Sequence, residues 1–406
     1  MRKIDPGNFT LATRSTAREI NRQILLNLVR ELQPVSRADL ARRMEMGPGM
    51  VTSLVNELLG EELLLEGESV EAPRGRKPKM LYVRTHDRLV IAIDLRLSVT
   101  QIELCDLAGR TIALEAFATS LEPARLVEEM ALRSARLLET HGGGGRCQGI
   151  GLVIPGMVDR VAGRVLNAPQ LGWRNVSMRD ELASATGMRV EIENGPIACA
   201  LAKMWLARRG GAPEGDFAYL SVFDGVGAGL VVGGQIVRGA GHTAGEFGHV
   251  PTDPRGTRCL CGARGCLEAH TSNLATLSRY LGLDLSAPGT RERLTEEGLS
   301  VPDLINRARS GDSRARAAIE ETGRHLALGL VNLIHALNPA RVFVGGEIVG
   351  AWEVIDPLVR AELRARALTE MELATPILPD QSLGNPRLRG AAALVAAPLF
   401  AAPSFA

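Results

Sequence analysis

The chain contains 406 residues, of which 45% are hydrophobic and 23% are charged, and its formal net charge is +1. These values are ordinary for a globular protein of two or three domains. The first ten residues lack the apolar segment of a signal peptide, and no stretch approaches the run of about 18 apolar residues that a membrane span requires, so we expect neither secretion nor membrane insertion. Because only six cysteines are present and three of them cluster, we expect a cytoplasmic protein.

The first predicted helix covers residues 16–32 and is ended by Pro34. Apolar residues recur along it at helical spacing, which indicates one face packed against the rest of a small domain. They are Ile20, Ile24, Leu25, Leu28, Val29 and Leu32.

Two further short helices follow. The second begins after Ser36, which can cap it together with Asp39, and it ends near Met44. The third covers about 48–59, where Gly47 can act as the cap and a proline stands at the first helical position.

Two short strands, at 62–66 and 80–84, flank the polar stretch GESVEAPRGRKPK. Three helices followed by a β-hairpin predict a winged helix-turn-helix domain, an α+β DNA-binding module, over residues 1–86. This segment carries a net charge of +3. The alternative is a small helical dimerisation domain whose basic loop is merely solvated.

The third helix would lie in the major groove of a double-stranded operator, with the wing against phosphates or the minor groove. Its outward-facing side chains, which we expect to contact DNA, are Met50, Thr52, Ser53 and Asn56. Asn56 can read adenine and Met50 can touch thymine methyl groups, but no arginine is available for guanine. Wing contacts to phosphate are assigned to Arg74, Arg76 and Lys77. Further arginines that could contribute to affinity are Arg14, Arg18, Arg37 and Arg42.

From residue 88 onward, buried strands alternate with long amphipathic helices, which predicts an α/β architecture. The pattern of strands occurs twice, and this apparent duplication indicates two similar lobes around a cleft. The predicted strands are 89–94, 100–105, 111–118 and 148–156 in the first half, and 217–223, 227–234 and 341–346 in the second.

One histidine and three cysteines lie between Gly245 and Glu268, in a loop rich in glycine. Thiolates with an imidazole are the ligand set of a closed tetrahedral zinc site. The alternative is disulfides or reduced surface thiols, but three cysteines cannot all pair among themselves. We therefore predict structural zinc as the cofactor, held by His249, Cys259, Cys261 and Cys266.

The chain resembles the ROK family of repressors and sugar kinases over essentially its whole length. The motifs that carry the resemblance are GEFGH…CLCGARGCLE, Pro155-Gly156-Met-Val-Asp159, Ala168-Pro169-Gln-Leu-Gly172-Trp173, Glu193-Asn194, Gly225-Val-Gly227-Ala-Gly229 and Asn338-Pro339…Gly345-Gly346. The N-terminal segment matches the winged helix of the repressor branch through Asn21-Arg22, Ser36-Arg37-Ala-Asp-Leu40-Ala41, Asn56-Glu57-Leu58 and Arg74-Gly75-Arg76-Lys77-Pro78.

The resemblance implies an actin-like, hexokinase-like fold of two ribonuclease-H-like lobes with a sugar between them. The small lobe would comprise 87–195 plus about 386–406, and the large lobe, with the zinc loop, 196–385. By position, the residues that would contact sugar hydroxyls are Asn194, Glu246, His249 and Glu268. His249 could bind zinc through one ring nitrogen and a hydroxyl through the other, so that the zinc loop supports the sugar site.

Two departures from the family's kinases argue against catalysis. Their Glu-Asn-Asp motif supplies the aspartate base, but this chain has Gly195 there, and loss of a general base typically costs about two to four orders of magnitude in rate. Their phosphate loop has a glycine where this chain has Arg96. Gly195, together with Gln170 in the sugar loop, also indicates a changed sugar specificity.

These observations predict a zinc-containing, sugar-responsive repressor without enzymatic activity, which binds DNA as a homodimer or homotetramer and has no membrane partner. Ligand binding would shift the lobes and thereby the DNA-reading elements. Two alternatives are a sugar kinase that also represses and a regulator controlled by a protein partner, with a vestigial sugar cleft.

Overall fold

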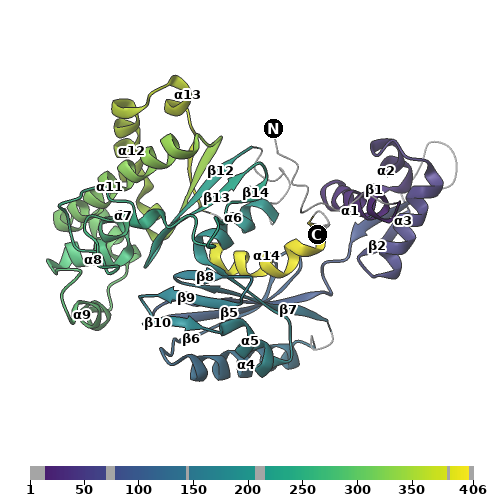
Figure 1. Ribbon diagram of the computed structural model, residues 1–406, viewed down its shortest axis with the longest axis horizontal. Coiled ribbons are helices and arrows are strands. Elements are labelled where there is room, and N and C mark those ends of the chain that lie inside the picture. Colours follow the sequence, from purple (N-terminus) through teal and green to yellow (C-terminus); the bar gives the residue numbers. More distant parts are fainter. Residues whose placement is uncertain (1–13, 70–77, 143–145, 206–214, 382–384, 402–406) are drawn as a thin grey trace.

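The computed structural model describes residues 14–69, 78–142, 146–205, 215–381 and 385–401. The N-terminal domain packs three helices against a three-stranded antiparallel sheet of order β1-β3-β2 (Figure 1). Its elements are α1 (Arg14–Leu32), β1 (Val35–Ser36), α2 (Arg37–Arg43), α3 (Pro48–Gly60), β2 (Leu64–Ser69) and β3 (Lys79–Val83). This confirms the predicted order of three helices and two longer strands, to which the structure adds the short β1.

The local sequence signals for the second and third helices are confirmed. Ser36 accepts the backbone N–H of Asp39, whose carboxylate in turn accepts the N–H of Ser36, so α2 begins with a full capping box. Gly47 is the N-cap of α3, and Pro48 occupies its first turn.

The predicted apolar face of the first helix is wrong at its N-terminal half. Ile20 and Ile24 are 39% and 45% exposed, whereas Leu25, Leu26 and Val29 are fully buried. The reason is that α1 meets α3 through ion pairs in this half, where Arg22 contacts Glu57 of α3 and Glu61 at its C-cap. The apolar contacts are therefore shifted toward the C-terminal half of α1.

The small lobe is built on a five-stranded sheet of order β11-β7-β4-β5-β6, in which β4–β6 form an antiparallel meander and β4, β7 and β11 are parallel. Its elements are β4 (Leu89–Asp94), β5 (Val99–Asp106), β6 (Thr111–Ala118), α4 (Pro123–Thr140), β7 (Cys147–Ile154), α5 (Met178–Thr186) and β11 (Val190–Asn194). A small sheet that the sequence did not predict, β8 (Met157–Asp159), β9 (Arg164–Ala168) and β10 (Trp173–Val176), lies beside it.

The large lobe repeats this topology with the order β14-β13-β12-β15-β16, again an antiparallel meander followed by two parallel strands. The two-lobed, duplicated α/β architecture is thereby confirmed. The strands are β12 (Phe217–Val222), β13 (Val226–Val232), β14 (Gln235–Ile236), β15 (Arg341–Gly345) and β16 (Ile377–Pro379). The other elements are η1 (Phe247–His249), α7 (Leu267–Thr271), α8 (Asn273–Leu281), α9 (Thr290–Glu297), α10 (Val301–Arg309), α11 (Ser313–Leu337), η2 (Glu347–Ala351), α12 (Trp352–Arg366) and α13 (Glu370–Leu373).

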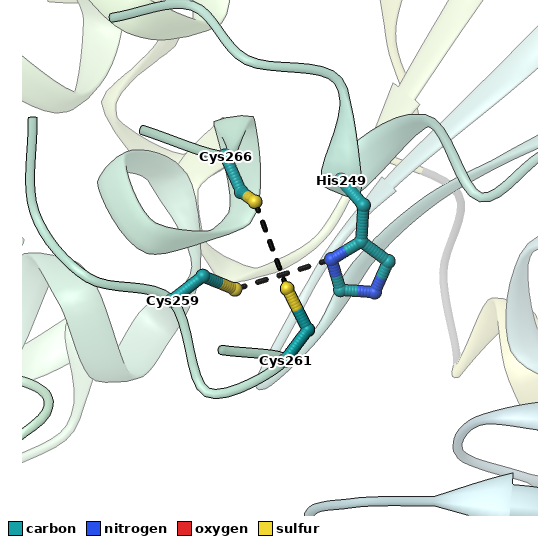
Figure 2. A group of neighbouring side chains, drawn as sticks. All are labelled: His249, Cys259, Cys261 and Cys266. Carbon is teal, nitrogen blue, oxygen red and sulfur yellow. Dashed lines mark hydrogen bonds between the residues drawn. The ribbon is translucent and has the colours of Figure 1, made fainter. Parts of the chain in front are cut away.

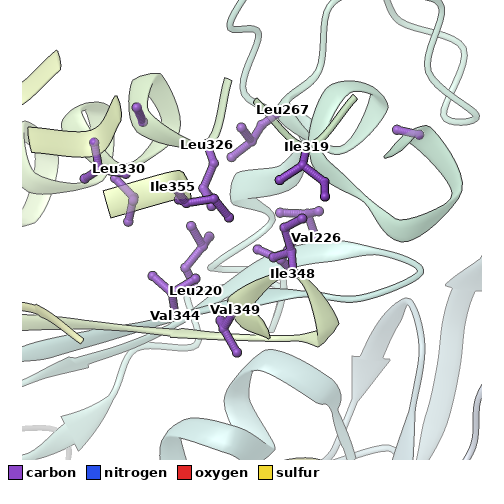
Figure 3. Packing of buried hydrophobic residues seen from close by; sticks show 14 of the residues in the cluster. Leu220, Val226, Leu267, Ile319, Leu326, Leu330, Val344, Ile348, Val349 and Ile355 are labelled. Atoms are coloured by element: carbon purple, nitrogen blue, oxygen red, sulfur yellow. The ribbon is translucent and has the colours of Figure 1, made fainter. Parts of the chain in front are cut away.

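Each lobe has its own apolar core. In the large lobe, Leu326 and Leu330 of α11 and Ile355 of α12 pack over Leu220 and Val344 of the sheet (Figure 3). In the small lobe, α4 and α5 cover one face of the sheet. Within the described residues, no helix combines the length and apolar character needed to cross a bilayer.

Two helices fill the space between the sheets: α6 (Gly195–Trp205) and α14 (Pro386–Phe400) (Figure 1). The α14 helix packs on β4 and β7, and α6 packs on β12 and β13. They touch at Gly390, where a side chain would collide with the backbone of Ala198. Their N-terminal ends therefore belong to the interlobe region that holds the site.

Candidate metal centre and sugar pocket

The four predicted metal ligands converge in one cluster (Figure 2). His249 ends η1, Cys266 is the N-cap of α7, and the other two cysteines lie on the intervening loop. Bridges Pro251–Cys266 and Arg258–Arg264 fold this loop into a tight hairpin. Gly265 has a positive φ of 72°, and any side chain there would collide with the Asp253 carbonyl oxygen, so the turn requires glycine.

The geometry of the cluster fits a tetrahedral metal. With Zn–S bonds of about 2.3 Å, two sulfurs on one zinc lie about 3.8 Å apart. The sulfurs of Cys261 and Cys266 are separated by 3.8 Å, and the Cys259 sulfur lies 3.9 Å from Nδ1 of His249. All four ligand atoms fall within 4.8 Å of one another. The set therefore has the chemistry and spacing of a closed four-ligand site.

The metal loop forms one wall of a cavity between the two lobes that opens to solvent. All four residues predicted to contact sugar line this cavity: Asn194, Glu246, His249 and Glu268. Cys261 and Leu260 of the metal loop line it too. The structure thus brings the predicted metal and sugar residues together in one place.

His249 faces both parts of the site. Its Nδ1 points toward the sulfurs, and its Nε2 lies 3.7 Å from a carboxylate oxygen of Glu246. Glu268 accepts the backbone N–H of Val226 at 2.9 Å, which fixes one carboxylate oxygen. Burial raises the pKa of both Glu246 and Glu268 above the ordinary value. The imidazole therefore faces the cysteine sulfurs on one side and the cavity on the other.

Asn194 stands at the end of β11, where the chain turns directly into α6. Its side-chain oxygen accepts the backbone N–H of Ile197 at 3.1 Å, so the amide caps the helix. The cavity is lined by this amide and by Gly195, the first residue of α6.

Sequence reasoning missed Arg387, which fills the space over Gly195. A Cβ on residue 195 would collide with Nη1 of Arg387, and Arg387 also lines the cavity. Arg387 belongs to the first turn of α14, nearly 200 residues further along the chain. The sequence signal is a pair of arginines, Arg387 and Arg389, at the start of an otherwise alanine- and leucine-rich helix.

An ion cluster beside the cavity joins the two lobes. Asp94, which is fully buried, accepts from Arg96 at 2.9 Å, from Asn385 at 2.7 Å and from Arg387. Arg96 also pairs with Glu347 of the large lobe at 2.9 Å. Burial would raise the pKa of Asp94, but the two guanidinium groups outweigh burial and hold that pKa below its ordinary value.

The sequence model of the ROK family matches residues 90–397. The chain belongs to the ROK family. It is 31% identical to a putative xylose repressor of Caldicellulosiruptor sp. (strain Rt8B.4), over 81% of this chain and 84% of that protein.

Two solved ROK structures differ in how much of this chain they match. A ROK family transcriptional regulator, a homologue of the Escherichia coli MLC protein, superposes with a TM-score of 0.79 and 26% identity, over 95% of this chain and 97% of that one. A ROK glucokinase from Streptomyces griseus, solved with glucose and AMPPNP, matches with a TM-score of 0.64 and 26% identity, over 98% of its own length but 75% of this chain. The similarity to the regulator therefore extends over more of this ROK chain than the similarity to the kinase does.

The N-terminal domain of this ROK chain exposes all four predicted DNA-reading side chains of α3: Met50, Thr52, Ser53 and Asn56. Two arginines of neighbouring helices contact this face of α3, and each also pairs with a carboxylate, Arg18 with Glu57 and Arg37 with Glu66. Arg18 of α1 donates to Ser53 at 3.2 Å, and Arg37 of α2 lies 3.4 Å from the Asn56 oxygen. The predicted wing residues Arg74, Arg76 and Lys77 lie outside the described residues.

Proposed function

We propose that this ROK chain is a sugar-responsive transcriptional repressor whose sugar cavity has no kinase activity. The observation that carries the proposal is the joining of a winged-helix domain to a ROK cavity with Gly195 at the position of the base. The similarity to a putative xylose repressor over 81% of this chain, and to a ROK transcriptional regulator over 95% of it, supports the proposal. DNA would be read by Met50, Thr52, Ser53 and Asn56, with wing support from Arg74, Arg76 and Lys77, by a homodimer or homotetramer.

Two features support the absence of phosphoryl transfer. Glycine has no side chain to accept the proton of a sugar hydroxyl, and the guanidinium of Arg387 stands where a carboxylate at residue 195 would project. Arg96 closes the phosphate region through its pairs with Asp94 and Glu347. The glycine loop is explained by packing, because a side chain at Gly229 would collide with the Pro196 carbonyl oxygen.

The metal in this proposal is zinc in a structural role. Four protein ligands fill a tetrahedral site and leave no open position for an activated water. When bound, zinc would fix the loop and orient the His249 ring toward the cavity. The sugar would then be held by Asn194, Glu246, His249 and Glu268.

The two interlobe helices provide a physical connection between the cavity and the DNA-binding domain. Both α6 and α14 begin at the cavity, which their first turns line, and the last residue of each contacts α1. Arg30 of α1 donates to the carbonyl oxygen of Trp205 at 2.8 Å and lies over the rings of Trp205 and Phe400. Asn27 donates to the Phe400 carbonyl oxygen at 2.8 Å. A ligand that shifts either helix would therefore change how α1 packs against the ends of α6 and α14.

The proposed function can be tested by measuring how tightly the protein binds DNA and whether a sugar releases it. Duplexes selected from a random library by the full-length protein should bind with dissociation constants of about 10⁻⁸ to 10⁻¹¹ M at physiological salt, and binding should weaken steeply as salt rises. Adding sugars and sugar derivatives one at a time should reveal a ligand that weakens binding by about 5- to 150-fold, the usual range of allosteric coupling. Fluorescence anisotropy of the labelled duplex measures both effects.

Three results would contradict the proposal. One is the absence of any sequence-selective duplex. Another is an operator affinity that no ligand changes, which would favour control by a protein partner. The third is turnover of ATP at ordinary kinase rates with any sugar of the same panel, measured by coupled ADP release.

The connection through α1 predicts that Arg30→Ala uncouples the two domains. Operator affinity should stay within about threefold of the wild type, because Arg30 faces the interlobe helices rather than α3. The ligand-induced weakening should fall to less than about threefold, since the contacts that transmit a shift of α6 and α14 are removed. Anisotropy titrations with and without the effector measure the loss.

Arg88→Ala is the matched control. Arg88 also bridges the N-terminal domain and the small lobe, through the Glu61 carbonyl oxygen at 2.8 Å and Gln148 at 3.2 Å. The Arg88→Ala variant should lower the ligand response much less than the Arg30→Ala variant does. Equal loss in both variants would show that general loosening of the domain contact, not the path through α6 and α14, controls the response.

A further inference from the structure

The arginine over Gly195 adds a chemical feature that a cavity for neutral sugars does not require. We propose that the ligand of this cavity is a sugar that carries an acidic group, a carboxylate or a phosphate, and that Arg387 recognises this group. The inference rests on the proposed sugar-responsive function and names the class of ligand that the same site takes.

Arg387 is held in one orientation. Its residue is only 6% exposed, its Nε donates to Asp94, and its Nη2 donates to the Leu95 carbonyl oxygen at 3.0 Å. The third guanidinium nitrogen, Nη1, is the atom that lies over Gly195 at the cavity wall. Because the guanidinium is planar and permanently charged, fixing two of its nitrogens fixes the direction of the third. A donor is therefore aimed at the space that Gly195 leaves open.

Two helix ends add to the positive potential there. The first residue of α6 is Gly195, and Arg387 lies in the first turn of α14, so both N-termini meet at this part of the wall. Both helices are long enough, at 11 and 15 residues, to carry a partial positive charge at the N-terminus. An anionic ligand group placed here would be favoured by the helix ends and by Nη1 together.

The neighbouring acids do not cancel this potential. Asp94 and Glu347 carry two negative charges, and these are matched by Arg96 and Arg387. Asp224, a third buried acid near these two arginines, has its pKa raised by burial and by Glu347. The amides that cap the two helices, Asn194 and Asn385, carry no charge and leave the positive end of each helix dipole in place. The side chains of Glu246 and Glu268 come from the large lobe, where they can accept hydrogen bonds from ligand hydroxyls. A ligand with hydroxyls and one acidic group would therefore be bound in a single orientation.

The test compares sugars that differ only at carbon 6. Glucose, galactose, mannose and N-acetylglucosamine are each titrated into the full-length, zinc-loaded protein, beside the matching 6-carboxylate and 6-phosphate, by isothermal titration calorimetry. In at least one series an acidic member should bind at least about tenfold more tightly than the neutral member, since a hydrogen bond to a charged group is the stronger kind. The two acidic arms distinguish a carboxylate from a phosphate ligand.

A pair of glycine variants assigns the preference to Arg387. Gly195→Ala places a methyl group against Nη1 and should reduce the acidic-to-neutral affinity ratio to near one without removing any charge. Gly225→Ala also adds a methyl group to the cavity wall, but against Gln170 and Glu268. It should weaken both members alike and leave the ratio unchanged. Arg387→Lys, which keeps the charge opposite Asp94, should lower the ratio as well.

The inference is overturned if, in every series that binds, the neutral sugar binds as tightly as its acidic partners, and that result leaves the sugar-responsive function standing. It is also overturned if Gly225→Ala abolishes the acidic preference while Gly195→Ala retains it. Binding of neither class in any series overturns both this inference and the sugar response. An acidic preference that Gly195→Ala removes supports the inference.

Discussion

Replacing Cys266 by serine is expected to remove the metal from the protein and with it the response to ligand. Cys266 is 1% exposed, caps α7 and supplies one of the four ligand atoms. Loss of a ligand should weaken zinc binding by more than about a hundredfold, because even indirect partners of a ligand are worth about 10- to 100-fold. Elemental analysis should show about one zinc per wild-type chain and almost none in the variant.

The same variant tests DNA binding and the ligand response separately. The zinc loop forms a wall of the cavity and has no part in α1, α2 or α3. Operator affinity should therefore be kept while ligand-induced release is lost, together with a fall in melting temperature. Cys105→Ser is the control, since Cys105 is equally buried in β5 but lies outside the cluster. Normal zinc content in Cys266→Ser would contradict the assignment of the metal site.

The sequence predicted the metal site because its ligands are close together along the chain. The spacing of His249 and three cysteines within one loop needs little information about the rest of the fold. The capping box of α2 and the proline at the start of α3 were predictable for the same reason, since capping depends on neighbouring residues.

Contacts between distant segments could not be predicted in this way. Arg387 reaches Gly195 only because α14 packs between the two sheets, and Arg30 reaches Trp205 only because α1 docks on the ends of α6 and α14. The exposure of Ile20 and Ile24 has the same origin, since ion pairs with α3 rotate the apolar face of α1. Periodicity shows that a helix has an apolar face, but its partners decide which residues the face includes.

These long-range contacts add information about the site that the family motif does not contain. The motif positions Asn194, Glu246, His249 and Glu268 predict a sugar cavity, and the structure gathers them around one space. Whether the cavity suits a kinase depends on Asp94, Arg96 and Arg387, which come from two segments at opposite ends of the ROK domain. Arg96 and Arg387 both pair with Asp94, and no short motif contains all three residues.

The pairing of Asp94 with Arg96 and Arg387 predicts a large effect of mutation on stability. Asp94→Asn should lower the free energy of unfolding by about 3–5 kcal/mol, because it leaves Arg96 and Arg387 without the buried carboxylate that both contact. The melting temperature should fall by roughly 5–10 °C. Asp356→Asn is the control, since Asp356 pairs with Arg360 on the partly exposed face of α12 at 3.4 Å and should change little.

The cause of the stability loss can be identified from how the difference in melting temperature between the wild type and Asp94→Asn depends on pH. Because the pKa of Asp94 is lower in the folded than in the unfolded chain, the carboxylate stabilises the fold at every pH above its unfolded pKa of about 3.9. This contribution is lost as the pH falls through the folded pKa. The difference in melting temperature between the wild type and Asp94→Asn should therefore be constant from pH 8 to about pH 5 and shrink only below about pH 4. A difference that already disappears near pH 6 would show that Asp94 is not held ionised by the two arginines.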